Sequence, residues 1–547
     1  MSLYTAGMKV CLGSLIALAL LSIWGVLGPN ATLPAPSPAY DLVIRGGTII
    51  DGTGKPAFVA DLAVRGGKIA KVAKLENPIA REFIEAAGLV VAPGFVDAHN
   101  HTEFAIADPA KRFNEGFLRQ GVTTIVGGAD GTLSPNQISR LLEAYERNSV
   151  ATNVAFYVGH NAIRYLVMAG ERRAPTTDEL EAMKSLVRDG MEAGALGFSS
   201  ALMYEPGRHS KTKELIALAR EAALCNGIYD CHVRDPGHAL LESNREAIEV
   251  GERAGIPVKI ATELVVGLEN KGLSKQVVEL IEAARARGVK VVTDQFPYDG
   301  AHTAGLFELI RVPGELRGQP AFDLAAALRD PVLRGRLKEA SENGISGGFA
   351  WLKASGYSQM RITSSADYPG LAGKYLSQLA TERNLSGFDL VCDLISRAAY
   401  PVGITLAAAD EEDVREILKQ PWNMIASDGV YSDGITPQGH PRSTGSFPRV
   451  LGYYVREARV LTLPEAIRKM TALPADCLGL HDRGRITQGL AADIVVFDPE
   501  KVSDRSTWEQ PQKYAEGVEH LIVNGTVVLS NGKLTGQAPG IFLKRQR

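Results

Sequence analysis

Apolar runs alternate with amphipathic segments through most of the chain. The runs typical of buried strands lie at 122–128, 153–160, 196–202, 227–233, 257–263, 290–298 and 423–429. Between them, segments such as 176–194 and 274–288 repeat apolar residues at helical spacing. With one more strand at 90–101, this alternation predicts an α/β fold, a parallel (β/α)8 barrel (TIM barrel) in preference to an open doubly wound sheet.

Both ends of the body have a different pattern, in which apolar and polar residues alternate and Gly-containing turns separate short runs. This pattern is typical of short antiparallel strands. We therefore expect a small β-sandwich built from both termini, 40–95 and 485–547, beside a barrel at 96–484. Helices and turns without a barrel-strand pattern predict an insertion at about 306–373.

The extreme N-terminus is apolar. Residues 10–27 carry no charge and precede a Pro-rich spacer, which predicts that residues 1–39 form a signal peptide or membrane anchor with its spacer. We expect an exported protein, periplasmic or extracellular, or one tethered to a membrane through residues 10–27. The alternatives are a wrongly chosen start codon and a helix packed on the body.

Composition narrows the function classes. The chain of 547 residues has a formal net charge of −3, whereas nucleic-acid-binding domains usually carry a basic stripe, so no nucleic-acid partner is expected. The five cysteines are scattered and contain no CxxC pair, which argues against a disulfide framework or a structural zinc knuckle.

Two histidines separated by one residue, His99 and His101, follow the apolar run that begins at Val90. Residues two apart on a strand share a face, so both imidazoles can converge on one point. Further polar residues stand at later strand ends: Asp130, His160, His232, Glu263, Asp294, Tyr298 and Asp428. A lone buried histidine is usually a hydrogen-bonded core residue, but this joint pattern predicts a divalent metal, and imidazole with carboxylate suits zinc.

Several segments resemble a known family. The segment "PGFVDAHNHTE" is similar to the opening motif of the amidohydrolase superfamily, and "GVTTIVGGADG", "GALGFSSALMYEPG", "HPRSTGSFPRVL" and "AIRKMTALPA" resemble the N-acyl-D-amino-acid deacylases (D-aminoacylases). The resemblance runs from about Tyr40 to the C-terminus. It implies a hydrolase with one or two zinc ions that cleaves a small-molecule N-acyl amino acid, or a similar amide, to a carboxylate and a free amine.

The resemblance also implies roles for particular residues. His99 and His101 match metal ligands, and His232 matches a ligand of the tighter zinc. Asp428 matches the catalytic aspartate, which takes a proton from the attacking water and passes it to the leaving amine, and which also contacts the metal. Two matches concern the substrate: Arg442 would bind its carboxylate and Tyr298 would assist binding.

The chain departs from the family pattern at two places. Asp130 stands where the family has a metal-bridging cysteine; it is either a carboxylate ligand or a cap of the next helix. Thr262 and Leu264 stand where the family has a zinc histidine and a substrate-binding lysine. Glu263 lies one residue away and would need a bulge to turn inward.

These departures leave three outcomes open. The metal moves toward His99, His101 and Asp428, or Asp130 and Glu263 rebuild a carboxylate-rich site, or catalysis is lost. We expect a retained metal-dependent amidohydrolase of the deacylase type. The alternatives are a related dipeptidase or cyclic amidase, and a non-catalytic barrel that lost a metal ligand.

Overall fold

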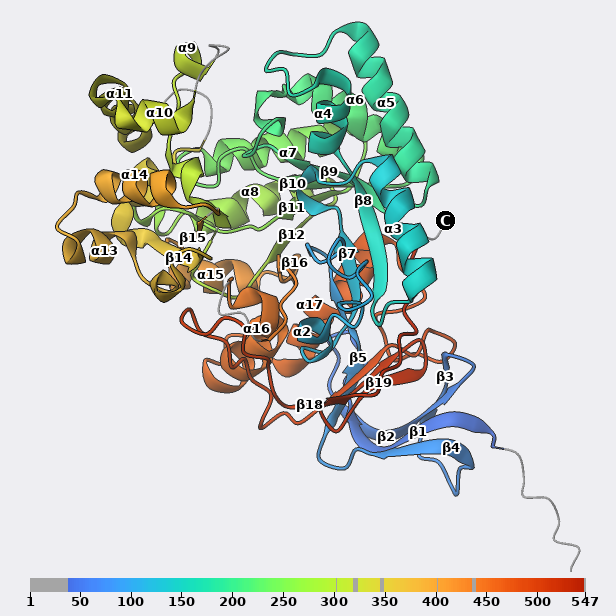
Figure 1. The fold of residues 1–547 in the computed structure, drawn as a ribbon. Helices are drawn as coiled ribbons and strands as arrows, with labels where there is room; N and C mark the ends of the chain where they lie inside the picture. Colours follow the sequence, from blue (N-terminus) through green and yellow to red (C-terminus); the bar gives the residue numbers. More distant parts are fainter. Residues whose placement is uncertain are drawn as a thin grey trace, which may run out of the picture.

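The computed structural model describes residues 38–301, 303–317, 323–344, 349–400, 402–434 and 439–545. A barrel occupies the centre of the molecule, a sheet built from both ends of the chain lies at one end, and an insertion projects from one side (Figure 1). The predicted signal or anchor at 10–27 lies outside the described residues. Among the described residues, no helix has the length and apolar character needed to cross a membrane.

The barrel sheet confirms the predicted fold class. Its parallel strands follow the order β16-β12-β11-β10-β9-β8-β7-β6. Their bounds are β6 Phe95–Asp97, β7 Val122–Gly127, β8 Asn153–Gly159, β9 Gly197–Ala201, β10 Ile228–His232, β11 Val258–Ala261, β12 Val291–Gln295 and β16 Asn423–Ile425. A parallel bridge between Asn100 and Gly429 joins the ends of the first and last strands, so the C-terminal ends of all strands surround one region, where barrel active sites lie.

Helices cover the outside of the barrel because each carries an apolar face. They include α3 (Pro135–Asn148), α4 (His160–Met168), α5 (Thr177–Glu192), α6 (Thr212–Leu224), α7 (Leu240–Ala254), α8 (Ser274–Ala286) and α15 (Glu411–Lys419). In α5, a capping box between Thr176 and Glu179 starts the helix, and Met183 and Val187 are buried. Nearly all residues of the strands beneath are buried, as throughout β8, because helices cover one face and the barrel interior covers the other.

The predicted strand at 90–101 is two strands. β5 (Val90–Pro93) pairs with the terminal sheet, whereas β6 begins after Gly94 and pairs with β7. A Cβ at position 94 would lie 2.2 Å from Thr123 Cγ2, so only glycine allows the chain to pass this close to β7. Pro93–Gly94 is thus the junction between the terminal sheet and the barrel sheet.

The terminal sheet brings together both ends of the described chain. Its strand order is β20-β19-β18-β17-β5-β1-β2-β3, with β4 on β1. The bounds are β1 Tyr40–Ile49, β2 Phe58–Arg65, β3 Lys68–Ala73, β4 Ala80–Glu85, β17 Ile494–Phe497, β18 Val518–Val523, β19 Thr526–Ser530 and β20 Lys533–Leu534. Leu42, Val91 and Ile494 belong to its separate apolar core.

The insertion contains an antiparallel sheet of β13 (Thr303–Gly305), β15 (Gly403–Leu406) and β14 (Met360–Ser364). Its helices are α9 (Gly314–Arg317), α10 (Leu324–Arg329), α11 (Pro331–Asn343), α12 (Trp351–Ser355), α13 (Leu376–Glu382) and α14 (Gly387–Arg397). We expected the insertion at about 306–373, but its sheet extends beyond both ends of that range. β13 lies just before residue 306, and the central strand β15 lies just before α15.

Candidate metal centre

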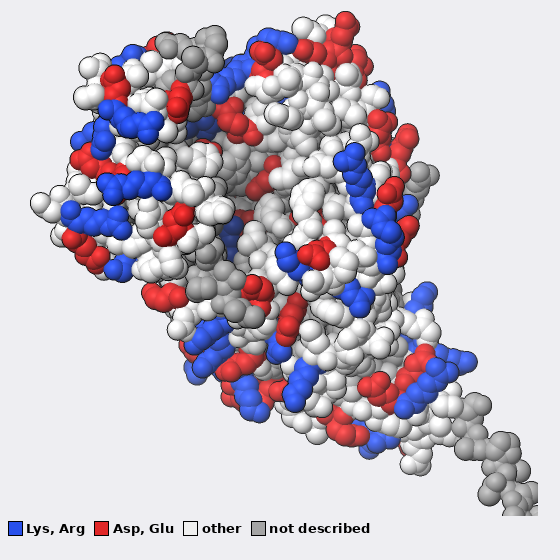
Figure 2. All heavy atoms as spheres, in the orientation of Figure 1, with Lys and Arg blue, Asp and Glu red and all other residues white. Residues whose placement is uncertain are grey.

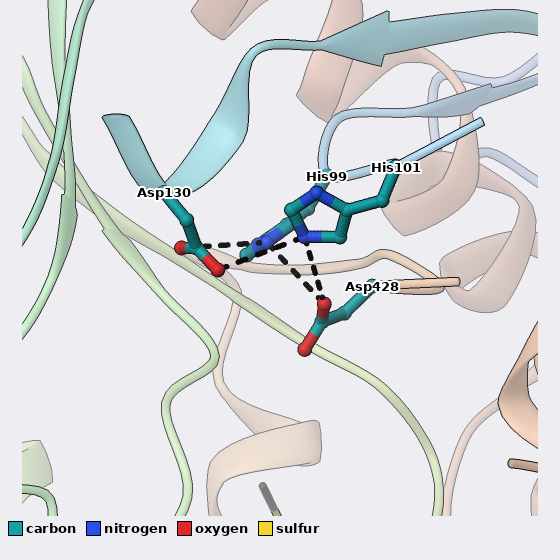
Figure 3. Close-up of side chains that lie close together, drawn as sticks. All are labelled: His99, His101, Asp130 and Asp428. Carbon is teal, nitrogen blue, oxygen red and sulfur yellow. Dashed lines mark ion pairs between the residues drawn. The ribbon is translucent and has the colours of Figure 1, made fainter. Parts of the chain in front are cut away.

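Four side chains converge at the C-terminal ends of the barrel strands (Figure 3). Within the described part of the chain, one ligand atom from each of His99, His101, Asp130 and Asp428 lies within 4.8 Å of the others. His99 Nε2 is 3.7 Å from Asp130 Oδ1 and 3.5 Å from Asp428 Oδ1. His101 Nε2 is 3.6 Å from Asp130 Oδ2 and 3.2 Å from Asp428 Oδ1.

Contacts between the first and last barrel strands place three of these residues. The Asp428 amide donates to the His99 carbonyl at 2.9 Å, and the His101 amide donates to the Gly429 carbonyl at 2.9 Å. Below them, the buried carboxylate of Asp97 accepts the Ser427 amide at 2.9 Å. The closure of the barrel therefore brings the histidine pair to Asp428.

A tight turn after β7 presents Asp130. Gly128 and Asp130 both have left-handed backbone conformations, with φ of 76° and 58°. Ser199 on β9 stabilises the turn, because its hydroxyl donates to the Gly128 carbonyl and accepts the Gly131 amide. Asp130 does not cap the following helix, because Ser134 is the N-cap of α3. The capping alternative is therefore wrong.

The site concentrates ionised groups in a buried space. Burial disfavours a charged His99, but the nearby carboxylates of Asp428 and Asp294 raise its pKa well above the usual value. Burial opposes ionisation of Asp428 as well, yet the charges of Arg442 and His99 hold the pKa of Asp428 well below its usual range. The pKa of Asp130 is also lowered, by His232 and His99 acting against burial. Both carboxylates are therefore ionised at neutral pH.

These four residues fit a divalent metal. Among the described residues, His99 Nε2 and Asp130 Oδ1 are buried without a hydrogen-bond partner, and buried polar atoms seldom stay unpaired. The four nitrogen–oxygen distances of 3.2 to 3.7 Å, with Asp130 meeting His99 and His101 through different carboxylate oxygens, are short enough for one ion to contact all four residues. Imidazole with carboxylate suits zinc.

Of the residues predicted to bind substrate, Arg442 lies at this site. It begins α16 (Arg442–Arg449), and its Nη1 donates to Asp428 Oδ2 at 2.7 Å. Its guanidinium also lies 4.6 Å from the centre of the Phe296 ring. Tyr298 is placed differently: its hydroxyl donates to Asp504 Oδ2 at 3.2 Å, so in this structure its polar end points toward the C-terminal segment.

The opposite wall of the site, at the ends of β10 and β11, carries the second departure from the family pattern. His232 ends β10, and its ring lies edge-on to Tyr204; it falls outside the four-residue group. Thr262 Oγ1 lies 3.5 Å from Asp428 Oδ2. Glu263 turns the other way, because its Oε1 accepts from Asn244 on α7 at 3.1 Å. Glu263 thus supplies no ligand to the group, which corrects the possibility that it rebuilds the site, and Leu264 is buried.

The sequence did not reveal some residues that support the site. Glu103, which ends the segment "HNHTE", is buried, and its carboxylate accepts the Gly128 amide at 3.2 Å ahead of the Asp130 turn. Lys259 is buried inside the barrel and contacts two aspartates. A lysine inside the apolar run "PVKIA" was the available signal, because an uncompensated charge is rarely buried.

The surface is hollowed between the insertion and the barrel helices, and acidic and basic side chains lie deep in the hollow (Figure 2). Openings of this kind at the C-terminal face of a barrel are common ligand sites.

Comparisons with known proteins agree with this arrangement. The model of the amidohydrolase family matches residues 82–529. The D-aminoacylase of Alcaligenes xylosoxydans xylosoxydans is 34% identical over 531 residues, 93% of this chain and 98% of the relative. The N-acyl-D-glutamate deacylase of Bordetella bronchiseptica, solved with zinc and a phosphonate mimic of the tetrahedral intermediate, has a TM-score of 0.78 and 31% identity, covering 93% of this chain and 100% of that one.

A solved D-aminoacylase with a binuclear metal centre has a TM-score of 0.77 and 34% identity, covering 92% of this chain and 100% of that one. The family model spans the barrel and, in the terminal sheet, β5, β17 and β18, whereas the relatives cover more than nine tenths of the chain. This chain belongs to the amidohydrolase family.

Proposed function

We propose that this chain is a zinc-dependent hydrolase that cleaves the amide bond of N-acyl-D-amino acids, or of similar N-acyl compounds, to a carboxylate and a free amine. The convergence of His99, His101, Asp130 and Asp428, with Arg442 against Asp428, carries this proposal. The relatives named above act on substrates of this class.

The four converging residues would hold the zinc ion. When bound, zinc lowers the pKa of water and polarises the amide carbonyl. Asp428 accepts the proton of the attacking water and donates it to the leaving nitrogen. Asp428 suits this role because it is ionised and its Oδ1 lies 3.2 Å from His101 Nε2. Its backbone is held in place because the Asp428 amide donates to the His99 carbonyl.

Arg442 would bind the carboxylate of the substrate. Its guanidinium is buried at the end of the site, and a planar fork of N–H donors matches a carboxylate. The ion pair with Asp428 and the ring of Phe296 hold the guanidinium in position before substrate arrives. A substrate carboxylate beside Arg442 would bring the neighbouring amide toward Asp428. Tyr298 would assist substrate binding indirectly, by supporting the residues around Arg442. Its ring packs against the Arg449 guanidinium and against His440.

The substitution Arg442→Met is expected to lower kcat/KM about 100-fold for an N-acyl amino acid, because charged hydrogen bonds contribute roughly 1.5–3 kcal/mol each. Steady-state kinetics on a matched pair of substrates checks the reason. The wild type should prefer the N-acyl amino acid over the N-acyl amine that lacks the carboxylate, and Arg442→Met should remove this preference. An unchanged preference would mean that Arg442 does not bind the substrate carboxylate and only supports Asp428.

The substitution Thr262→His is expected to create a second zinc site beside His232 and Asp130. Thr262 has a φ of 54°, which strains a β-branched residue but is more tolerable for histidine. Bound zinc, measured by elemental analysis after dialysis, should rise from a single ion per chain toward two. Thr262→Asn is the matched control, since it relieves the same strain without adding an imidazole, and it should leave the zinc content unchanged.

The function itself is tested with purified protein, a panel of N-acyl-D- and N-acyl-L-amino acids, dipeptides and cyclic amides, and metal analysis. We expect zinc at the four-residue group and release of the free amine from N-acyl-D-amino acids. Hydrolysis confined to dipeptides or cyclic amides would favour the related dipeptidase or cyclic amidase. Less than about half a metal per chain together with no hydrolysis would favour a non-catalytic barrel, because the chemistry requires an intact site.

The location we propose is outside the cytoplasm, exported or tethered. The support is the uncharged run at 10–27 followed by the Pro-rich spacer. Fractionation of cells that express the full chain, with and without residues 1–39, tests this location.

A further inference from the structure

Three charged side chains are buried together inside the barrel, one layer deeper than the metal ligands. Lys259 on β11 lies between Asp230 on β10 and Asp294 on β12, and all three are nearly inaccessible to solvent. Lys259 Nζ is 2.6 Å from Asp230 Oδ1 and also contacts Asp294 Oδ2. We call these residues the Lys259 cluster.

Asp294 connects the cluster to the metal site by both carboxylate oxygens. Asp294 Oδ2 lies 3.5 Å from His99 Nδ1, the ring nitrogen on the far side from Asp130 and Asp428. Asp294 Oδ1 accepts the backbone amide of Thr262 at 2.7 Å. The same carboxylate therefore contacts the ring of a metal ligand and supports the left-handed turn on the opposite wall.

Lys259 determines whether Asp294 can hold this position. Two carboxylates inside an apolar barrel are costly without a cation. The ring of Tyr157 lies 5.8 Å from the ammonium, and the Cys477 thiol is also close enough to interact with its charge. Without Lys259, no buried cation would lie between the carboxylates of Asp294 and Asp230, and they would repel each other. Asp294 would then lose its fixed orientation toward His99.

We propose that Lys259 is a positioning residue, which acts through Asp294 to orient His99 and so sets the zinc affinity of the site. This inference rests on the proposed zinc site. The physical basis is general: a carboxylate behind a metal-binding histidine fixes which ring nitrogen carries the proton and how the ring is turned. Lys259 would influence the metal without contacting metal or substrate.

The test compares zinc dissociation constants, measured by competition with a chromophoric chelator, in Lys259→Met, Asp294→Asn and the double variant. Each single variant is expected to weaken zinc binding about 10- to 100-fold, the usual effect of removing a partner of a metal-binding histidine. The double variant should be no weaker than the weaker single variant, because both changes remove the same support. It also removes one charge of each sign, so it remains testable where Lys259→Met alone does not fold.

Lys469→Met is the matched control. Lys469 is also a buried lysine, and it donates to the Asn423 carbonyl at 3.0 Å, outside the metal group. Its loss should lower the melting temperature while the zinc dissociation constant stays within about twofold of the wild type. Wild-type zinc affinity in Lys259→Met and Asp294→Asn, or effects that add fully in the double variant, would overturn the inference. A wild-type protein that binds no zinc would instead overturn the proposed function and this inference with it.

Discussion

Asp428→Asn should reduce kcat by about 10²- to 10⁴-fold, the usual contribution of a positioned acid–base group. The substitution keeps the size of the side chain but removes the charge that accepts a proton. The amide also has a weaker attraction for Arg442 Nη1, now 2.7 Å from Asp428 Oδ2. Steady-state kinetics, with zinc content measured on the same sample, reports the result.

Zinc content separates the two roles of Asp428. If the Asp428→Asn variant retains zinc through the oxygen of the new side-chain amide while kcat falls, proton transfer is the main loss. Asp433→Asn is the matched control, because Asp433 is exposed and follows in the same loop, and it should leave kcat unchanged. A kcat within tenfold of the wild type in Asp428→Asn at full zinc content would contradict the proposed proton transfer.

His99→Ala should weaken zinc binding by about 10²- to 10³-fold. Zinc sites with four protein ligands bind with roughly 10–16 kcal/mol in total, so one ligand contributes about a quarter of this. His99 is also the most enclosed of the four, since its side chain is inaccessible to solvent and contacts Asp130, Asp294 and Asp428. Competition with a chelator measures the change directly.

A second measurement on His99→Ala follows thermal stability. A ligand that binds only the folded state raises the melting temperature as its concentration exceeds the dissociation constant. Added zinc should therefore stabilise the wild type and have little effect on His99→Ala. The exposed His481 provides the control His481→Ala, which should respond to zinc as the wild type does. An equal response in His99→Ala would place the zinc elsewhere.

The departures from the family pattern at positions 262 to 264 do not remove a residue from the four-residue metal group. They bear on how many metal ions the site can hold. Asp130, His99, His101 and Asp428 form a compact group without any residue of β11. A solved relative has a binuclear centre, whereas here Thr262 and the outward-facing Glu263 stand on that wall. The four-residue group offers one compact set of ligand atoms, and metal analysis of Thr262→His tests how many zinc ions the chain binds.

Local pattern alone determined much of this protein. The apolar runs located the barrel strands. Alternating apolar and polar residues marked the strands of the terminal sheet, whereas apolar residues at helical spacing marked the helices of the barrel. The period of two placed His99 and His101 on one side of the chain. Because parallel strands end at the same edge, the sequence also placed Asp130 and Asp428 beside them.

Only the tertiary structure decided how the opposite wall is built. Glu263 faces Asn244 of α7 because one residue of register turns a side chain from the interior of the barrel to its outside. Lys259 meets Asp230 and Asp294 only because β10, β11 and β12 are neighbours with a particular stagger. Such contacts join residues that are far apart in the chain, and their geometry depends on barrel closure, which no local pattern encodes.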